Sequence, residues 1–136
     1  MSTRRRTSDG GASAIEMSIV APALLLLVFT AVQVALWLYG RNVALQSARE
    51  GVSYLRLVIP GATPSSALAA AEVTAVNYAS QVGRDSVAGA TATATSAGGR
   101  RVRIEVTGRA VSLVPGLNLT VRGAAEGQIE QFEVDQ

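Results

Sequence analysis

Residues 19–39, IVAPALLLLVFTAVQVALWLY, form an apolar stretch without a charge. A helix rises ~1.5 Å per residue, so a helix of this length crosses a bilayer core of ~30 Å. Pro22 stands in the first turns of the stretch, where a proline removes fewer helical hydrogen bonds than it would at the centre. Trp37 and Tyr39 stand where an aromatic belt marks the far interface. We therefore predict one transmembrane helix.

Basic residues flank this stretch unequally. The triplet Arg4–Arg6 precedes it closely, whereas only Arg41 follows it at short distance. The positive-inside rule then predicts a single-pass protein of the cell (cytoplasmic) membrane, with its N-terminus in the cytoplasm and its C-terminal region outside. A cleaved secretory signal peptide fits poorly, because the apolar run is too long. A small-residue cleavage site ending at Ala35 would also be followed by apolar residues 36–38 rather than by a polar start.

The helical pattern continues beyond the membrane as a stem. It keeps a stripe of small or apolar residues at Ala44, Ala48, Val52 and Leu55. The pair Pro60–Gly61 then breaks the pattern. We predict one N-terminal helix over residues 12–58, with the span at 19–39.

The remaining residues, 59–136, are expected to form an extracytoplasmic α+β region. A second helix is predicted from Thr63 as N-cap, with Pro64 in the first helical position, to Gly83 as the C-terminal glycine. Its apolar face, which we expect to cover a small sheet, consists of Leu68, Ala71, Ala75, Tyr78 and Val82.

After Asp85 the hydrophobic period changes to two, which predicts antiparallel strands. In the segment RRVRIEVTG, the apolar residues Val102, Ile104 and Val106 alternate with polar ones. Gly98-Gly99 is expected to form a two-residue turn before this strand, and Pro115-Gly116 a turn after it. A meander of three to four strands results.

The composition excludes much catalytic chemistry. The 136 residues contain no histidine and no cysteine, which removes the commonest general base, thiolate nucleophiles, zinc–thiolate sites and disulfides. The acidic C-terminal segment GQIEQFEVDQ reads as a solvated terminus rather than as an acid–base pair. The arginines are spread along the chain without stacking aromatics, so nucleic-acid binding is not expected. We predict no active site, cofactor or metal.

A specific pattern precedes the span: a basic leader, Gly11, four residues, Glu16, and an apolar helix with Pro22. It resembles a class III, or type IV prepilin-like, signal. Together with Arg49 and Gly51 in SAREG, the stretch over about residues 8 to 56 resembles the TadE-like pseudopilins of tight-adherence (Tad/Flp) pilus systems. Met17 stands where an aromatic residue is common in that family.

The resemblance implies that a membrane-bound prepilin peptidase cuts between Gly11 and Ala12 and removes a cytoplasmic leader, residues 1–11. The cut exposes an α-amino group on Ala12 that is mostly protonated at neutral pH. Glu16 can neutralise this group, or that of a neighbouring subunit, from the positive end of the helix dipole. Expected partners are the lipid bilayer, the prepilin peptidase, and other pilins, pseudopilins and Tad assembly components.

Two other functions remain open at this point. A single-pass membrane anchor presenting a small partner-binding domain would need the same span and sheet but no cut at Ala12. An extracytoplasmic hydrolase is the more distant alternative, and activity on an ester, peptide or glycoside would support it.

Overall fold

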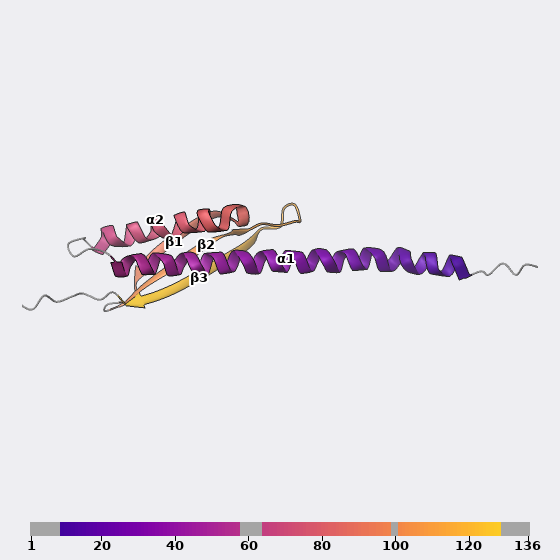
Figure 1. The fold of residues 1–136 in the computed structure, drawn as a ribbon, viewed down its shortest axis with the longest axis horizontal. Helices are drawn as coiled ribbons and strands as arrows, with labels where there is room; N and C mark the ends of the chain where they lie inside the picture. The colour runs from indigo at the N-terminus through magenta and orange to yellow at the C-terminus, as the bar shows by residue number, and fades with distance from the viewer. Residues whose placement is uncertain (1–8, 58–63, 99–100, 129–136) are drawn as a thin grey trace, which may run out of the picture. The chain divides into compact units, whose positions relative to one another are not determined.

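The computed structural model describes the backbone of residues 9–57, 64–98 and 101–128, with side chains from Ser13 onward except that of Pro64. Two helices, α1 (Asp9–Leu57) and α2 (Pro64–Gly83), precede a short 3₁₀ helix, η1 (Arg84–Ser86), and the strands β1 (Val87–Ser96), β2 (Arg101–Ala110) and β3 (Leu119–Gln128) (Figure 1). The predicted α+β class, with a long helix, a second helix and a small antiparallel sheet, is confirmed.

Helix α1 begins at Asp9, three residues before the predicted start at residue 12. Gly10 and Gly11 have low helix propensity, but propensity is a weak determinant of structure, and the backbone is helical through both. The helix ends at Leu57. The predicted breakers at 60–61 and the predicted N-cap Thr63 lie outside the described residues.

The chain divides into two units, Met1–Val34 and Ala35–Gln136. In the first unit, the described residues belong to α1 and their large apolar side chains are exposed. The hydroxyl of Thr30 donates to the carbonyl of Leu26 at 2.8 Å, so this polar group is satisfied within the helix. Among the described residues, one helix is long and apolar enough to cross a membrane, and it covers Ser13–Leu57.

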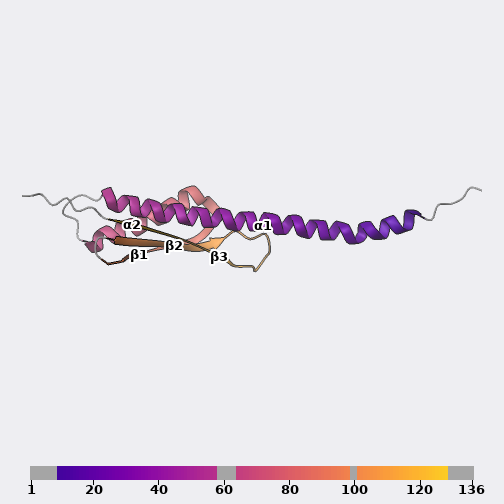
Figure 2. The same cartoon turned by 90° about the horizontal axis from the view of Figure 1, so that it is seen from below.

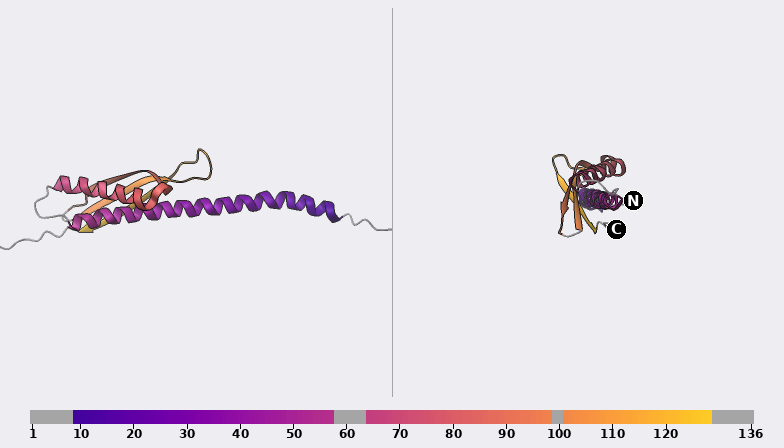
Figure 3. Two further views of the ribbon diagram at one scale, coloured as in Figure 1. Left: turned by 45° about the horizontal axis from the view of Figure 1, so that its top comes forward. Right: turned by 90° about the vertical axis from the view of Figure 1, so that its left-hand side faces the viewer.

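In the second unit the three strands form an antiparallel sheet in the order β1-β2-β3. Helix α2 and the C-terminal part of α1 lie on the same face of this sheet, as Figures 2 and 3 show. Val102, Ile104 and Val106 point into the core, with exposures of 5%, 0% and 0%. The predicted register of β2 is therefore confirmed.

Small residues let the two helices and the sheet approach one another closely. The fully buried alanines of the core are Ala44 and Ala48 on α1 and Ala71, Ala75 and Ala79 on α2. A Cβ atom at Gly123 of β3 would clash with the backbone of Ala44 and Leu45, so α1 lies directly on β3. The predicted stripe of Ala44, Ala48, Val52 and Leu55 is buried in full.

The buried face of α2 differs from the prediction at its C-terminal end. Val82 is 46% exposed, and Ala79 is fully buried instead. The buried alanines of α2 recur every four residues, whereas a helix turns once every 3.6 residues. The contact stripe therefore winds around α2 and leaves Val82 in solvent.

Strand β1 contains a bulge that the alternation did not predict. The pairs Ala88↔Arg109 and Thr91↔Thr107 enclose two residues on β1 but one on β2, and Gly89 has a φ of 61°. The extra residue reverses which positions of β1 face the core. Val87 can therefore be buried on the same face as Ala92 and Ala94, although its number has the opposite parity.

The pairing of β1 with β2 extends to Ala97, just before the predicted Gly98-Gly99 turn. The N–H of Ala97 donates to the carbonyl of Arg101 at 2.9 Å, and the N–H of Arg101 donates to the carbonyl of Gly98 at 3.3 Å. Gly99 itself lies outside the described residues. The Pro115-Gly116 turn is confirmed: the N–H of Leu117 donates to the carbonyl of Val114 at 3.2 Å.

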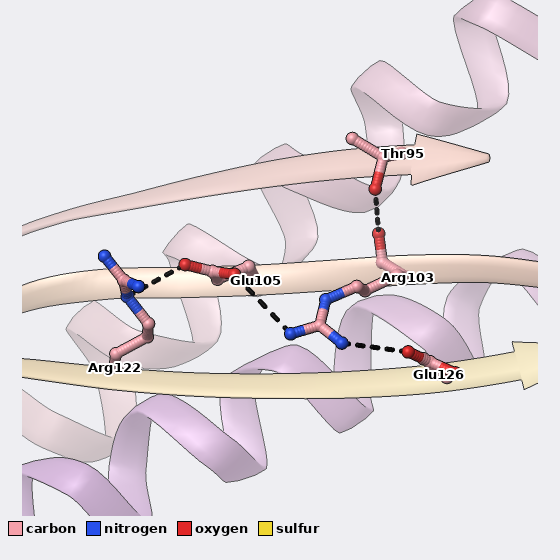
Figure 4. Close-up of polar contacts among 5 residues, drawn as sticks. All are labelled: Thr95, Arg103, Glu105, Arg122 and Glu126. Atoms are coloured by element: carbon pink, nitrogen blue, oxygen red, sulfur yellow. Dashed lines mark hydrogen bonds and ion pairs between the residues drawn. The ribbon is translucent and has the colours of Figure 1, made fainter. Parts of the chain in front are cut away.

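The face of the sheet away from the helices carries alternating charges (Figure 4). Arg103 contacts Glu126 at 2.9 Å and Glu105 at 3.8 Å, and Glu105 also contacts Arg122 at 2.9 Å. All four side chains are at least 30% exposed, so each pair contributes little to stability. These contacts pair the charges of Glu105 and Glu126 with those of Arg103 and Arg122.

Candidate processing and assembly site

The candidate site occupies the beginning of α1. Gly11 and Ala12 are the third and fourth residues of this helix, which starts at Asp9. The first backbone N–H groups of a helix have no partner within it. Two consecutive glycines, Gly10 and Gly11, further weaken the helix at this point. The Gly11–Ala12 peptide bond thus lies in the turn of α1 that costs least to unwind.

Glu16 lies four residues after Ala12 along the same helix, and its side chain is exposed. Residues four apart are neighbours on a helix surface. The Glu16 carboxylate can therefore lie close to the N-terminus of a helix that begins at Ala12. The side chain of Ala12 is not among those described.

Glu16 is the eighth residue of α1 as the helix stands, counting from Asp9. A helix beginning at Ala12 would make it the fifth. The favourable interaction between a carboxylate and the helix dipole falls off within the first turn. Removal of residues 1–11 would therefore bring the N-terminus of the helix closer to Glu16 and strengthen the interaction of its carboxylate with the helix dipole.

Two other residues of the motif lie in the second unit. Arg49 is exposed and lines a shallow cleft with Val52, Ser53, Arg56, Ala125 and Glu126. Gly51 is buried, and a Cβ atom there would lie 3.0 Å from the carbonyl oxygen of Ala71. The glycine of SAREG therefore permits close packing of α1 on α2.

The sequence interpretation missed two contacts that tie the helices to the sheet. The carboxylate of Glu72 on α2 accepts a hydrogen bond from the N–H of Ala94 at 2.7 Å. The indole N–H of Trp37 donates to the carbonyl of Thr120 at 3.2 Å. Trp37, predicted as an interfacial aromatic, also packs on the buried cluster of Val43, Val87, Ala110 and Val121. No sequence signal pairs residues so far apart.

Comparison with protein families gives one match, to the family described as TadE-like protein, over residues 11–53. The matched region starts at Gly11 and includes Glu16, the whole apolar stretch and Gly51. Neither the curated proteins nor the solved structures contain a match to this chain. The identified region coincides with most of α1, and the sheet lies outside it. Over residues 11–53, this chain is therefore similar to TadE-like proteins.

Proposed function

We propose that this chain is a minor pilin or pseudopilin that a prepilin peptidase cuts between Gly11 and Ala12. It is a non-enzymatic membrane component that contributes to assembly of a Tad/Flp pilus or of a related secretion system. The observation that carries the proposal is the spacing of Gly11 and Glu16 at the start of an apolar helix whose large side chains are exposed, inside the region that matches the TadE-like family.

The physical reason begins with the leader. Its arginines, Arg4–Arg6, set the orientation of the span and leave with the leader once insertion is complete. The cut then leaves a cationic α-amino group at the edge of the bilayer, where an uncompensated charge is costly. Glu16 supplies a compensating carboxylate on the same chain or to a neighbouring subunit.

The apolar surface of α1 supports the assembly role. Its large side chains from Ile15 to Phe29 are exposed within this chain. In the bilayer, lipid covers them. In an assembly, the same helix surface can pack on other pilins or pseudopilins, with Tad assembly components as further partners. The extracytoplasmic region of residues 59–136 remains outside the cytoplasm.

The test is N-terminal mass spectrometry of the membrane fraction from cells with and without the prepilin peptidase. With the peptidase, we expect a chain beginning at Ala12. Gly11→Leu should block the cut, because glycine alone has no side chain to clash as the backbone passes through a protease site. The matched control is Gly10→Leu, which makes the same change one residue earlier and should leave the cut in place.

A wild-type chain that keeps Met1 to Gly11 in the presence of an active peptidase would reject the proposal. It would favour the alternative of a single-pass anchor that presents the sheet to a partner. If both leucine variants blocked the cut equally, a large side chain would be excluded at both positions. Gly11 would then not be the specific recognition residue.

A further inference from the structure

The loop between β2 and β3, residues 111–118, exposes an apolar cluster on the second unit. We call these residues the β2–β3 loop. Four of its side chains are large, apolar and exposed: Val111 at 37%, Leu113 at 46%, Val114 at 53% and Leu117 at 42%. No charged residue occurs from Ala110 to Val121. Water is therefore a poor environment for this loop.

The loop has an ordered shape of its own. Pro115 and Gly116 occupy the centre of a turn closed by the bond from Leu117 to Val114, and Gly116 has a φ of 83°. The hydroxyl of Ser112 donates to the carbonyl of Val114 and accepts from its N–H, both at 3.1 Å. The loop therefore satisfies several of its own backbone groups, which is what a segment entering an apolar medium requires.

The β2–β3 loop lies at the end of the sheet where α1 enters the second unit. The N–H of Val111 donates to the carbonyl of Ser86 at 3.3 Å, and a Cβ atom at Gly40 of α1 would lie 3.5 Å from the same oxygen. Thr120, just after the loop, accepts the bond from Trp37. In Figure 1 the loop joins the end of β2 to the start of β3, away from the arrowhead of β3.

Chain connectivity places this end of the sheet near a membrane. Trp37 is within the uncharged stretch 19–39, and the residues immediately before it form the apolar helix. If that helix crosses a bilayer, Trp37 lies at the surface of the bilayer, and the loop beside it does too. The loop thus lies next to the end of the apolar helix, which is the part of the chain expected to contact lipid.

Charges around the loop fit an anionic surface. Arg41, Arg84 and Arg109 are exposed, and none of them takes part in an ion pair among the described residues. Arg109 directly precedes the uncharged segment, and Arg84 begins the 3₁₀ helix whose Ser86 holds Val111. The acidic residue Asp85 directly follows Arg84. Arginines can reach lipid phosphates from this position while the apolar tip enters the interface.

We propose that the β2–β3 loop inserts into the outer interface of the bilayer that α1 crosses, with Leu113, Val114 and Leu117 at acyl-chain level and the three arginines at headgroup level. Such an insertion buries exposed apolar surface and attracts anionic lipid. It also gives the domain a second attachment, which limits how it tilts about α1. The inference rests on the membrane span of the proposed function.

The test measures the depth of labels in the full chain in vesicles of phosphatidylcholine and phosphatidylglycerol. The chain has no cysteine, so single cysteines can carry a fluorophore at Leu113→Cys, Leu26→Cys and Val73→Cys. Val73 is a matched control, because it is apolar and 60% exposed but lies on α2. Emission of the single tryptophan, Trp37, checks that each variant is folded.

We expect nitroxides shallow in the acyl chains to quench the Leu113 label several-fold more than the Val73 label, and deep nitroxides to quench the Leu26 label most. A Leu113 label no more quenched than the Val73 label, with Leu26 still quenched, would overturn the loop inference and leave the span intact. A Leu26 label outside the lipid would instead remove the span, and with it both proposals.

Two further measurements distinguish lipid from a second copy of the chain as the partner of the loop, and test the role of the arginines. Quenching of the Leu113 label that changes when the protein is diluted into more lipid would show that a second copy covers the loop, and would overturn the inference. Vesicles of phosphatidylcholine alone should reduce the quenching, because the arginines lose their anionic partners. Equal quenching in both vesicles would overturn the part assigned to the arginines.

Discussion

Gly51 of α1 lies against Ile104 of β2: a Cβ atom at Gly51 would be only 2.9 Å from the Cδ1 atom of Ile104. The same Cβ atom would lie 3.0 Å from the Ala71 carbonyl oxygen and 3.2 Å from the Ala75 Cβ atom. The absence of a side chain at Gly51 is therefore what lets α1, α2 and the sheet meet at one point.

We expect Gly51→Ala to lower the denaturation midpoint of the full chain in detergent micelles. Alanine is favoured over glycine in a helix by about 1 kcal/mol, but overpacking a core typically costs about 1 to 3 kcal/mol. The carbonyl of Ala71 is backbone and cannot give way as a flexible side chain can. The clash should therefore outweigh the gain in helix propensity.

Gly40→Ala is the matched control, since it makes the same change in the same helix. Its added Cβ atom would lie 3.4 Å from Ala110 Cβ and 3.4 Å from Val121 Cγ1, which is ordinary contact. We expect its midpoint to stay level or rise. Equal falls in both variants would show that helix packing does not discriminate between these two glycines.

Ile104→Ala should cost on the order of 2 to 4 kcal/mol of unfolding free energy, because Ile104 is fully buried at the centre of the core. Arg101→Ala, on the exposed face of the same strand, should cost under about 0.5 kcal/mol. Denaturant titration of both variants measures the difference. Similar midpoints would contradict the packing of β2.

Glu16→Leu should leave processing largely intact but prevent assembly. The change makes the helix more apolar and so does not oppose insertion, yet it removes the carboxylate that compensates the Ala12 ammonium. Mass spectrometry of the N-terminus follows processing, and surface pili or co-purifying pilus components follow assembly. Glu16→Asp keeps the charge and should restore assembly at least in part. Normal assembly of Glu16→Leu would refute charge pairing.

A reporter enzyme that is active only outside the cytoplasm, fused after Val134, should be active, because the basic cluster precedes the span. A second fusion carrying a reporter that works only in the cytoplasm should be silent. The reverse pattern would show that the orientation is wrong, whatever the state of processing.

The order of the elements, and the face that most of them bury, could be predicted from the amino-acid sequence. The uncharged stretch 19–39 predicted the apolar helix, and the alternation at Val102, Ile104 and Val106 predicted the buried face of β2. These properties are local, because a period of 3.6 or 2 records which side of one element is apolar. The spacing of Gly11 and Glu16 is likewise readable from the chain alone.

The contacts between the elements could not be predicted from the sequence and became visible in the three-dimensional structure. The bulge at Gly89, the contact of Gly123 with the backbone of α1, and the bond from Trp37 to Thr120 each depend on a partner far away in the sequence. Trp37 looked like an interfacial aromatic because its own neighbours are apolar. Its bond to Thr120 arises because α1 lies on the sheet, and close packing of that kind is set by two surfaces together rather than by either sequence alone.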